Sequence, residues 1–339
     1  MPDLRPASTR FVAILSLVAA LFCTHLPAAR AERDPVRLTH GPMLGQVTSS
    51  SVRVWGRTSD ADKFVVHYGI SADALEIVSE PANTAIEHDN TGVAQLADLK
   101  SDTKYYYHIF INDRPHGLPG SFRTLPEASE TQNAEYNPKG LYNFRFQIGS
   151  CANQNPIHGN GHRATTYEHL NKDWADKVNF HIMNGDWLYE ELREYPPEAW
   201  RLTQGLKQFP LSVEVMPTVV GVWENYKLYL SRGVELAKWH RHVPSYFTFD
   251  DHELVNDIWG SAETGKRHRR TVFRDIGTYA WHDYLGWANP MEHKHPIHFG
   301  KATMKAGSDL LVDPDSDFSK LPLKEMLNLH VHWGTAEAG

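Results

Sequence analysis

Three apolar segments in the second half of the chain each run into residues that can bind metal or take part in catalysis. They read FRFQIGSC (144–151), FHIMNGDWLY (180–189) and VPSYFTFDDH (243–252), and a segment with helical spacing (163–177) lies between the first two. Alternating strands and helices predict a sheet that has helices on its faces and is at least partly parallel. In such sheets the chemistry collects just beyond the carboxyl ends of the strands. We therefore expect the three segment ends to meet at one edge of one sheet.

The side chains at these segment ends are of ligand or catalytic type. The candidates are Cys151, Asp186, Tyr189, Asp250, Asp251 and His252. Each motif alone has an ordinary explanation, because Gly-Asp after a strand is commonly a turn and Asp-Asp is commonly a helix N-cap. Three consecutive strand ends that all carry such residues favour a shared site instead.

The residue types at this edge predict bound cations. Crowded carboxylates repel one another, and one of them would take up a proton unless a cation offset the charge. A thiol and a phenol are not ionised at neutral pH without a strong Lewis acid, whereas carboxylates suit harder ions such as calcium or magnesium. We expect a mixed site, with a redox-stable transition metal near Cys151 and Tyr189, harder ions near the other acids, and Asp186 as a bridge.

The first part of the chain has a different pattern. Residues 36–124 contain short alternating segments, such as VTSSSVRVWGRT and KYYYHIFIN, separated by polar turns. This spacing predicts an all-β sandwich, and the early Trp55 with the tyrosine-rich segment resembles a fibronectin-III-like module. Residues 125–140 are a polar, proline-punctuated linker. Residues 141–339 then form the predicted α/β domain.

The N-terminus predicts export. Arg5 and Arg10 precede the apolar run FVAILSLVAALFC, which leads to small residues that end at Ala31. A basic start, a short apolar core and a small-residue site indicate a secretory signal peptide over residues 1–31. The alternative is a membrane anchor, for which the run is short. We expect a periplasmic or extracellular protein without a membrane span.

The cysteine count excludes a disulfide in the mature chain, and the net charge bears on the class of partner. Removal of residues 1–31 would leave Cys151 as the only cysteine, so no disulfide could form within the mature chain. A lone thiol in an oxidising compartment is explained either by burial as a small apolar residue or by capture by a metal. The net charge of −7 argues against a nucleic-acid partner, which would need a basic surface.

The motifs GSCANQ, NGDWLYE and FDDHELVND, in this order and after a β-sandwich, resemble the PhoD-like alkaline phosphatases and phosphodiesterases of the metallophosphatase superfamily. The resemblance extends over roughly residues 36–260. It implies an α/β domain of the αββα metallophosphatase-like type behind the fibronectin-III-like sandwich. It also implies a secreted phosphoesterase that hydrolyses phosphate mono- or diesters by a metal-activated hydroxide, with Fe3+ and Ca2+ as cofactors.

The resemblance implies a role for each matching residue. Cys151, Asp186 and Tyr189 match ligands of ferric iron, with calcium ions alongside. Asp250 and Asp251 fall at the third metal motif, where Asp251 takes the place of an asparagine ligand in related phosphatases. These five residues are the core of the implied metal site.

The rest of the third motif supplies the implied catalytic group. His252 matches the histidine that contacts the phosphoryl group, where it would stabilise transition-state charge or protonate the leaving oxygen. Asn256 and Glu253 complete the motif, and Asn256 is taken as a further metal ligand. We expect His252 and Asp186 to be the catalytic residues, with direct in-line attack on phosphorus rather than a serine nucleophile.

The resemblance fails toward the C-terminus. Family members carry a late Gly-Asp-x-His type motif, which this sequence lacks. His330 and His332 in LNLHVHW would point to the same face of a strand and could replace the missing ligands; the alternative is a solvated strand face. The chain is also short for the family, so it is either a fragment or a shortened member.

A second function class is a catalytically impaired module that binds a carbohydrate or a cell-envelope polymer. The aromatic residues between 190 and 240 could hold such a ligand, although the same spacing fits an ordinary helix core. These residues are Tyr195, Trp200, Trp223, Tyr226, Tyr229 and Trp239. The sequence leaves open the choice between monoesters and diesters, and the oligomeric state.

Overall fold

The structure is a computed structural model of the 339-residue chain. It describes residues 34–191, 219–256, 269–290, 302–314 and 316–320. The chain separates into two units, residues 1–35 and 36–339, and every helix and strand described belongs to the second. The expected signal peptide, His330 and His332 lie outside the described residues.

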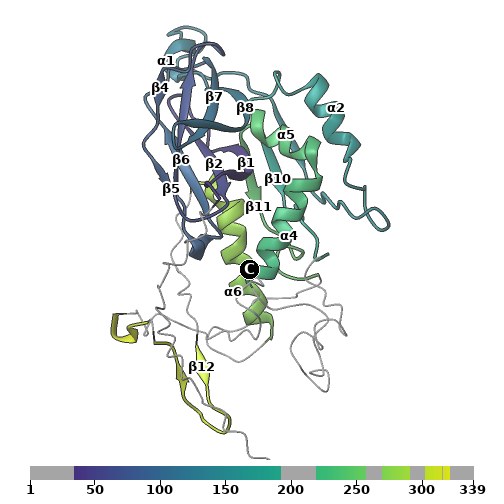
Figure 1. The fold of residues 1–339 in the computed structure, drawn as a ribbon. Coiled ribbons are helices and arrows are strands. Elements are labelled where there is room, and N and C mark those ends of the chain that lie inside the picture. The colour runs from purple at the N-terminus through teal and green to yellow at the C-terminus, as the bar shows by residue number, and fades with distance from the viewer. Residues whose placement is uncertain (1–33, 192–218, 257–268, 291–301, 315, 321–339) are drawn as a thin grey trace, which may run out of the picture. The chain divides into compact units, whose positions relative to one another are not determined.

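Short strands make up the region expected to be all-β (Figure 1). They are β1 (Leu38–Gly45), β2 (Val52–Thr58), β3 (Lys63–Gly69), β4 (Ile77–Val78), β5 (Ala82–Asn83), β6 (Thr91–Leu96), β7 (Lys104–Ile111) and β8 (Arg114–Arg123), with the 3-10 helix η1 (Ile86–His88) before β6. Every second side chain of β7 is buried, beginning with Tyr105 and Tyr107, as expected for a strand with one face in a core. The predicted β-sandwich is confirmed.

Helices and strands alternate in the second region. They are α1 (Ala128–Thr131), β9 (Phe146–Gly149), α2 (Thr165–Asp173), β10 (Phe180–Asn184), α4 (Val219–Arg232), α5 (Val234–His242), β11 (Ser245–Thr248), α6 (Arg269–Tyr284), η2 (Gly286–Ala288), β12 (Thr303–Met304), β13 (Leu311–Val312) and η3 (Phe318–Lys320). The three apolar segments form β9, β10 and β11, and the helical segment between the first two forms α2. The predicted α/β class is confirmed.

The main sheet joins strands from both regions. Its order is β6-β2-β1-β11-β10-β9, whereas β4, β3, β7 and β8 form a second sheet in which β5 also pairs with β3. β9 pairs in parallel with β10, with Phe146 opposite Phe180, and β10 pairs in parallel with β11, with Ile182 opposite Tyr246. Since these three strands are parallel and adjacent, their carboxyl ends lie at the same edge.

One close contact holds β1 against the second region. β1 pairs in parallel with β11 at Gly45 and Ser245. A Cβ at Gly45 would lie 2.5 Å from the Cβ of Ala288 in η2, so a side chain at this position would collide with η2. The indole N–H of Trp55 donates to the Asp283 carbonyl at 2.8 Å. The sandwich strands β1 and β2 therefore contribute directly to the packing of β11, η2 and α6.

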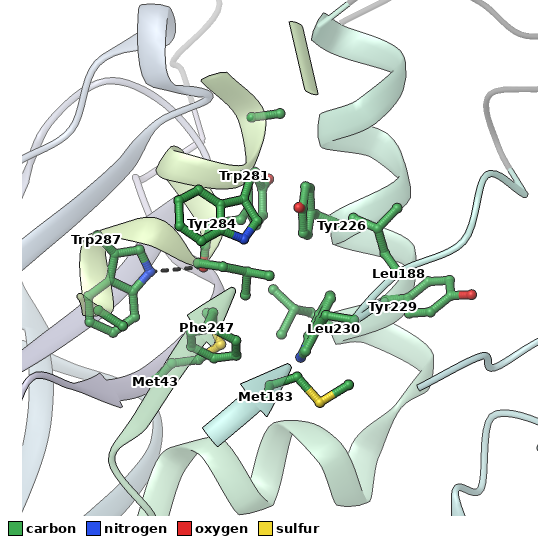
Figure 2. Packing of buried hydrophobic residues seen from close by; sticks show 14 of the residues in the cluster. Met43, Met183, Leu188, Tyr226, Tyr229, Leu230, Phe247, Trp281, Tyr284 and Trp287 are labelled. Carbon is green, nitrogen blue, oxygen red and sulfur yellow. Dashed lines mark hydrogen bonds between the residues drawn. The ribbon is translucent and has the colours of Figure 1, made fainter. Parts of the chain in front are cut away.

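An aromatic core lies beneath the parallel strands. Figure 2 shows Met183 of β10 and Phe247 of β11 in one cluster with Tyr226 and Leu230 of α4. The rings of Tyr226 and Tyr284 are stacked with centroids 4.7 Å apart, an arrangement that contributes about 0.5–1.5 kcal/mol beyond burial of area. Helix packing on this face fixes the positions from which the strand ends emerge.

The described helices include none that is long and apolar enough to cross a membrane.

Candidate metal centre

The loop after β10 makes a sharp turn that only glycine accommodates at its first position. Gly185 has a φ of +77°, and a Cβ there would lie 2.6 Å from the Cβ of Asp250. The loop after β10 and the loop after β11 are therefore in direct contact. A larger residue at position 185 would push Asp186 and Asp250 apart.

Two buried residues anchor the same loop. Trp187 and Leu188 are both 0% exposed, and the indole N–H of Trp187 donates to Nε2 of His240 at 3.1 Å. Because these two side chains pack into the aromatic core, the flanking Asp186 and Tyr189 side chains are left at the sheet edge. In the motif Gly-Asp-Trp-Leu-Tyr, the Trp and Leu side chains hold the loop against the core, and the Asp and Tyr side chains remain at the sheet edge.

The expected convergence of the three strand ends occurs at Asp186. The thiol of Cys151 and the phenol of Tyr189 each donate to Oδ2 of Asp186 at 3.3 Å. Ligand atoms of Asp186, Asp251 and His252 all lie within 4.8 Å of one another. The described structure therefore brings together one or more side chains from each of the loops that follow β9, β10 and β11.

The other oxygen of Asp186 provides a test of whether these residues fit a cation. Oδ1 of Asp186 is buried and has no hydrogen-bond partner among the described residues. A buried acceptor without a partner costs about 1–3 kcal/mol, and more when it is charged. A bound cation would remove that cost, and the surrounding thiol, phenol, carboxylate and imidazole groups are all metal ligands. The donor set fits a metal centre.

The backbone of two of these residues is in the left-handed region. Cys151 has a φ of 57° and Asp186 a φ of 55°. Aspartate tolerates this conformation, whereas for cysteine it is uncommon. Hydrogen bonds from the Cys151 N–H to the Gly185 carbonyl (3.3 Å) and from the Ala152 N–H to the Asp186 carbonyl (2.8 Å) hold both loops in place. Such conformations concentrate at functional sites.

Glu253 joins the loop after β10 to the loop after β11. Its carboxylate is fully buried and accepts backbone N–H groups from Asp186 (3.1 Å), Trp187 (2.6 Å) and Asp250 (2.7 Å). Burial raises the pKa of Glu253 to about 7, although the three N–H donors oppose that rise. Sequence reasoning left its role undefined, because the donors are main-chain groups that no motif reveals.

Glu190 orients the candidate catalytic histidine. Its Oε2 lies 2.8 Å from Nδ1 of His252, and its Oε1 accepts the backbone N–H of Asn256 at 2.5 Å. Burial acts to lower the pKa of His252, but Glu190, Asp186 and Asp251 outweigh it and the pKa is raised. Sequence reasoning missed Glu190, and its place directly after Tyr189 was the signal available.

Tyr189 is held as a neutral phenol by its surroundings. Burial, the Asp186 carboxylate and Cys151 all raise the pKa of Tyr189 above its usual value. Its ring packs against His252 with centroids 3.8 Å apart. Ionisation of this phenol would therefore require a strong Lewis acid at the oxygen.

Three of the predicted site residues, Cys151, Asp250 and Asn256, are exposed. Cys151 is exposed, so its explanation as a buried apolar residue is wrong. Asp250 is exposed, and neither it nor Cys151 belongs to the three-residue group within 4.8 Å. Asn256 is exposed, and its backbone N–H contacts Glu190.

The aromatic residues considered for ligand binding have a structural place. Trp223, Tyr226, Tyr229 and Trp239 are at most 3% exposed and belong to the core. The helix-core explanation of their spacing is therefore correct for these four. Tyr195 and Trp200 lie outside the described residues.

Comparison with known proteins identifies the family. The family model described as "PhoD-like phosphatase, N-terminal domain" matches residues 24–126, and the "PhoD-like phosphatase" model matches residues 146–305. A search of curated protein sequences returned no match. Together the two family models span both the sandwich and the strands that carry the candidate site.

The structure of PhoD has a similar fold. A structure of PhoD aligns with a TM-score of 0.57 and 18% identity, over 80% of this chain and 50% of that one. Purple acid phosphatase PPD1 from yellow lupin (Lupinus luteus) seeds aligns with a TM-score of 0.44 and 14% identity, over 77% of this chain and 42% of that one. This chain thus spans about half the length of the PhoD structure. With both domain models matched in order, the chain belongs to the PhoD-like phosphatase family.

Proposed function

We propose that the protein is a metal-dependent phosphoesterase that hydrolyses phosphate mono- or diesters. The observation that carries this proposal is the buried Oδ1 of Asp186, which has no partner among the described residues. The other oxygen of the same carboxylate, Oδ2, accepts the thiol of Cys151 and the phenol of Tyr189, and Asp186, Asp251 and His252 bring ligand atoms within 4.8 Å of one another. A cation is the group that would compensate this oxygen, and the family is one of phosphatases.

The metal ligands divide by chemistry. Cys151, Asp186 and Tyr189 would hold Fe3+, because sulfur and phenol oxygen favour a strong Lewis acid. Asp186 would also bridge to Ca2+ held by Asp251, with Asp250 and Asn256 at its margin. Such ions polarise phosphoryl oxygens and lower the pKa of coordinated water.

His252 would act on the substrate directly. Glu190 holds its Nδ1 at 2.8 Å, so Nε2 is the atom that would donate a proton to the leaving oxygen. Glu190 is then a positioning residue, and Glu253 holds the main chain on which Asp186 and Asp250 lie. His252 and the metal ligands would orient the ester so that the attacking oxygen approaches phosphorus from the side opposite the leaving group.

Hydrolysis by the purified protein tests the proposal. With Fe3+ and Ca2+ supplied, we expect turnover of nitrophenyl phosphate or bis-nitrophenyl phosphate and its loss in Asp186→Asn. Asp176→Asn is the matched control, since that carboxylate is 82% exposed and pairs with Lys104 on the surface. A protein that binds no metal and turns over neither ester would contradict the proposal and favour a binding module.

Visible absorption tests the assignment of iron. A phenol oxygen bound to ferric iron absorbs visible light, so the iron-loaded protein should be coloured. Tyr189→Phe should remove the phenolate contribution to this absorption while iron remains measurable by elemental analysis. Iron at one equivalent in a colourless protein would remove Tyr189 from the ligand set.

We further propose export, with residues 1–31 as a signal peptide. The basic start, the apolar run and the small-residue site at Ala31 support this. We also propose that the chain is divided into a β-sandwich domain at residues 36–124, a linker at residues 125–140 and a metallophosphatase-like domain that begins at residue 141. A mature N-terminus at residue 32 in protein recovered outside the cytoplasm is the expected result; an intact Met1 there would contradict it.

A further inference from the structure

The C-terminal end of α4 places one guanidinium between two loops of the candidate site. Nη1 and Nη2 of Arg232 donate to Oε2 and Oε1 of Glu191 at 2.8 and 2.5 Å. Its Nε donates to Oε1 of Gln154 at 3.1 Å. All three bonds use the planar fork of one side chain, a geometry that the single ammonium of lysine cannot reproduce.

The two acceptors belong to the loops that carry Cys151 and Tyr189. Gln154 follows Cys151 by three positions, and Glu191 follows Tyr189 by two. Arg232 therefore connects the loop after β9 to the loop after β10. No other charged side chain among the described residues is recorded in contact with both Gln154 and Glu191.

Tyr229, one turn earlier in α4, supports the same connection. Its hydroxyl donates to Oε1 of Glu191 at 3.1 Å, and its carbonyl accepts from Nε2 of Gln154 at 3.2 Å. The Arg232 guanidinium lies over its ring, 4.8 Å from the centroid. The next residue after α4 is also constrained, since a Cβ at Gly233 would lie 2.5 Å from Nε2 of Gln154.

The connection is shielded from water. Gln154 is 1% exposed, and the side chains of Arg232 and Glu191 are 21% and 18% exposed. An arginine–carboxylate pair with two parallel bonds and this degree of burial holds its geometry better than an exposed pair does.

We propose that Arg232 is a positioning residue that sets the separation between the Cys151 loop and the Tyr189 loop, so that the thiol and the phenol can reach one metal ion. The metal part of this inference rests on the proposed function, whereas the positioning of the loops does not. Arg232 acts through Gln154 and Glu191, and its recorded bonds do not reach Asp186 itself.

The first measurement uses the metal-free protein. The rate of alkylation at Cys151, read by peptide mass spectrometry, should increase several-fold in Arg232→Lys, because its loop then loses the Arg232 connection and keeps the two backbone hydrogen bonds to the Asp186 loop. Glu191→Gln should give the same change, and the double variant should add little, since both remove one connection. Arg123→Lys is the control, because Arg123 pairs with Asp102 on the sandwich surface.

The second measurement uses the iron-loaded protein. We expect Arg232→Lys to weaken iron binding by about 10–100-fold, as loss of an outer positioning group does, and to shift the visible absorption band. Loss of stability alone would lower the melting temperature without moving that band.

If the alkylation rate at Cys151 in Arg232→Lys equals that of wild type, the inference is wrong. If wild type binds no iron, the proposed function fails, and the alkylation rates still decide the role of Arg232.

Discussion

Two aspartates in this protein have opposite environments. Asp89, just before β6, accepts Nε and Nη2 of Arg57 at 3.0 and 2.8 Å, and Nζ of Lys227 lies 3.5 Å from it. Asp186 accepts only a thiol and a phenol from side chains, among the described residues, and one of its oxygens is buried without a hydrogen-bond partner.

The difference indicates that the Asp89 carboxylate has a structural role and that the Asp186 carboxylate has a ligand-binding role. A buried carboxylate surrounded by cations of its own chain needs nothing further, and the Asp89 cluster joins the sandwich to α4 and, through the Tyr284 hydroxyl, to α6. A carboxylate that has no such cation from its own chain is one that an outside cation would compensate. The chain compensates Asp89 permanently and leaves Asp186 for a ligand.

The largest expected effect on stability comes from removing the cation at the structural site. Arg57→Met should lower the free energy of unfolding by about 3–5 kcal/mol, because it leaves Asp89 buried with a reduced counter-charge. Chemical denaturation measures this. Arg123→Met is the control, since both side chains of the Arg123–Asp102 pair are more than half exposed and the pair should contribute about 1 kcal/mol or less. Equal losses of unfolding free energy in the two variants would contradict the structural role of the Asp89 charge.

Removal of the charge at the candidate metal centre should not lower the stability of the metal-free protein. Asp186→Asn should leave the metal-free protein as stable as wild type or more stable, because it removes an uncompensated charge and asparagine also tolerates a positive φ. Fe3+ alone, at a hundred times its dissociation constant, should stabilise wild type by about 2.7 kcal/mol. The variant should lose this increment. Thermal melts with and without the ions measure both effects, and a strongly destabilised metal-free variant would assign Asp186 a structural role.

His181 is a third buried ionisable group, and unlike the two aspartates it is uncharged at neutral pH. It is 0% exposed and neither ring nitrogen has a partner among the described residues, and burial lowers the pKa of His181 from 6.5 to about 3. The unfolded chain takes up a proton below pH 6.5 before the folded one does, so this stability is complete above pH 6.5 and declines as the pH falls. The decline should be about 1.4 kcal/mol per pH unit.

Replacement of His181 tests that decline. His181→Leu should flatten the dependence of unfolding free energy on pH between about 6 and 4. A residual slope should remain from His40, His240 and His242, because burial also lowers the pKa of each. The same substitution at exposed His158 should leave the slope unchanged. An unaltered slope in His181→Leu would show that its charge is accommodated in the fold.

The elements that follow regular patterns could be predicted from the sequence. The alternation of Tyr105, Tyr107 and Ile109 predicted β7, and the apolar segment before Gly185 predicted β10. The clustering of Cys151, Asp186 and Tyr189 followed from the rule that parallel strands end at the same edge. These features depend on residues that are near one another in the chain or on general topology.

Other parts of the site could not be predicted in this way. Glu190, Glu253 and Arg232 are ordinary charged residues in the sequence, and their roles follow from contacts with main-chain groups and with distant side chains. The pairing of β1 with β11 joins residues two hundred positions apart. Local patterns carry no information about such partners.

By itself, the sequence determined which segments become strands and helices and which chemical groups stand at the strand ends, because apolar periodicity and turn residues act over short distances. Only the tertiary structure decided that Asp89 is neutralised by Arg57 and Lys227 while Asp186 is not. Charge compensation depends on separations of a few ångströms in space, and these are set by packing between residues far apart in the chain.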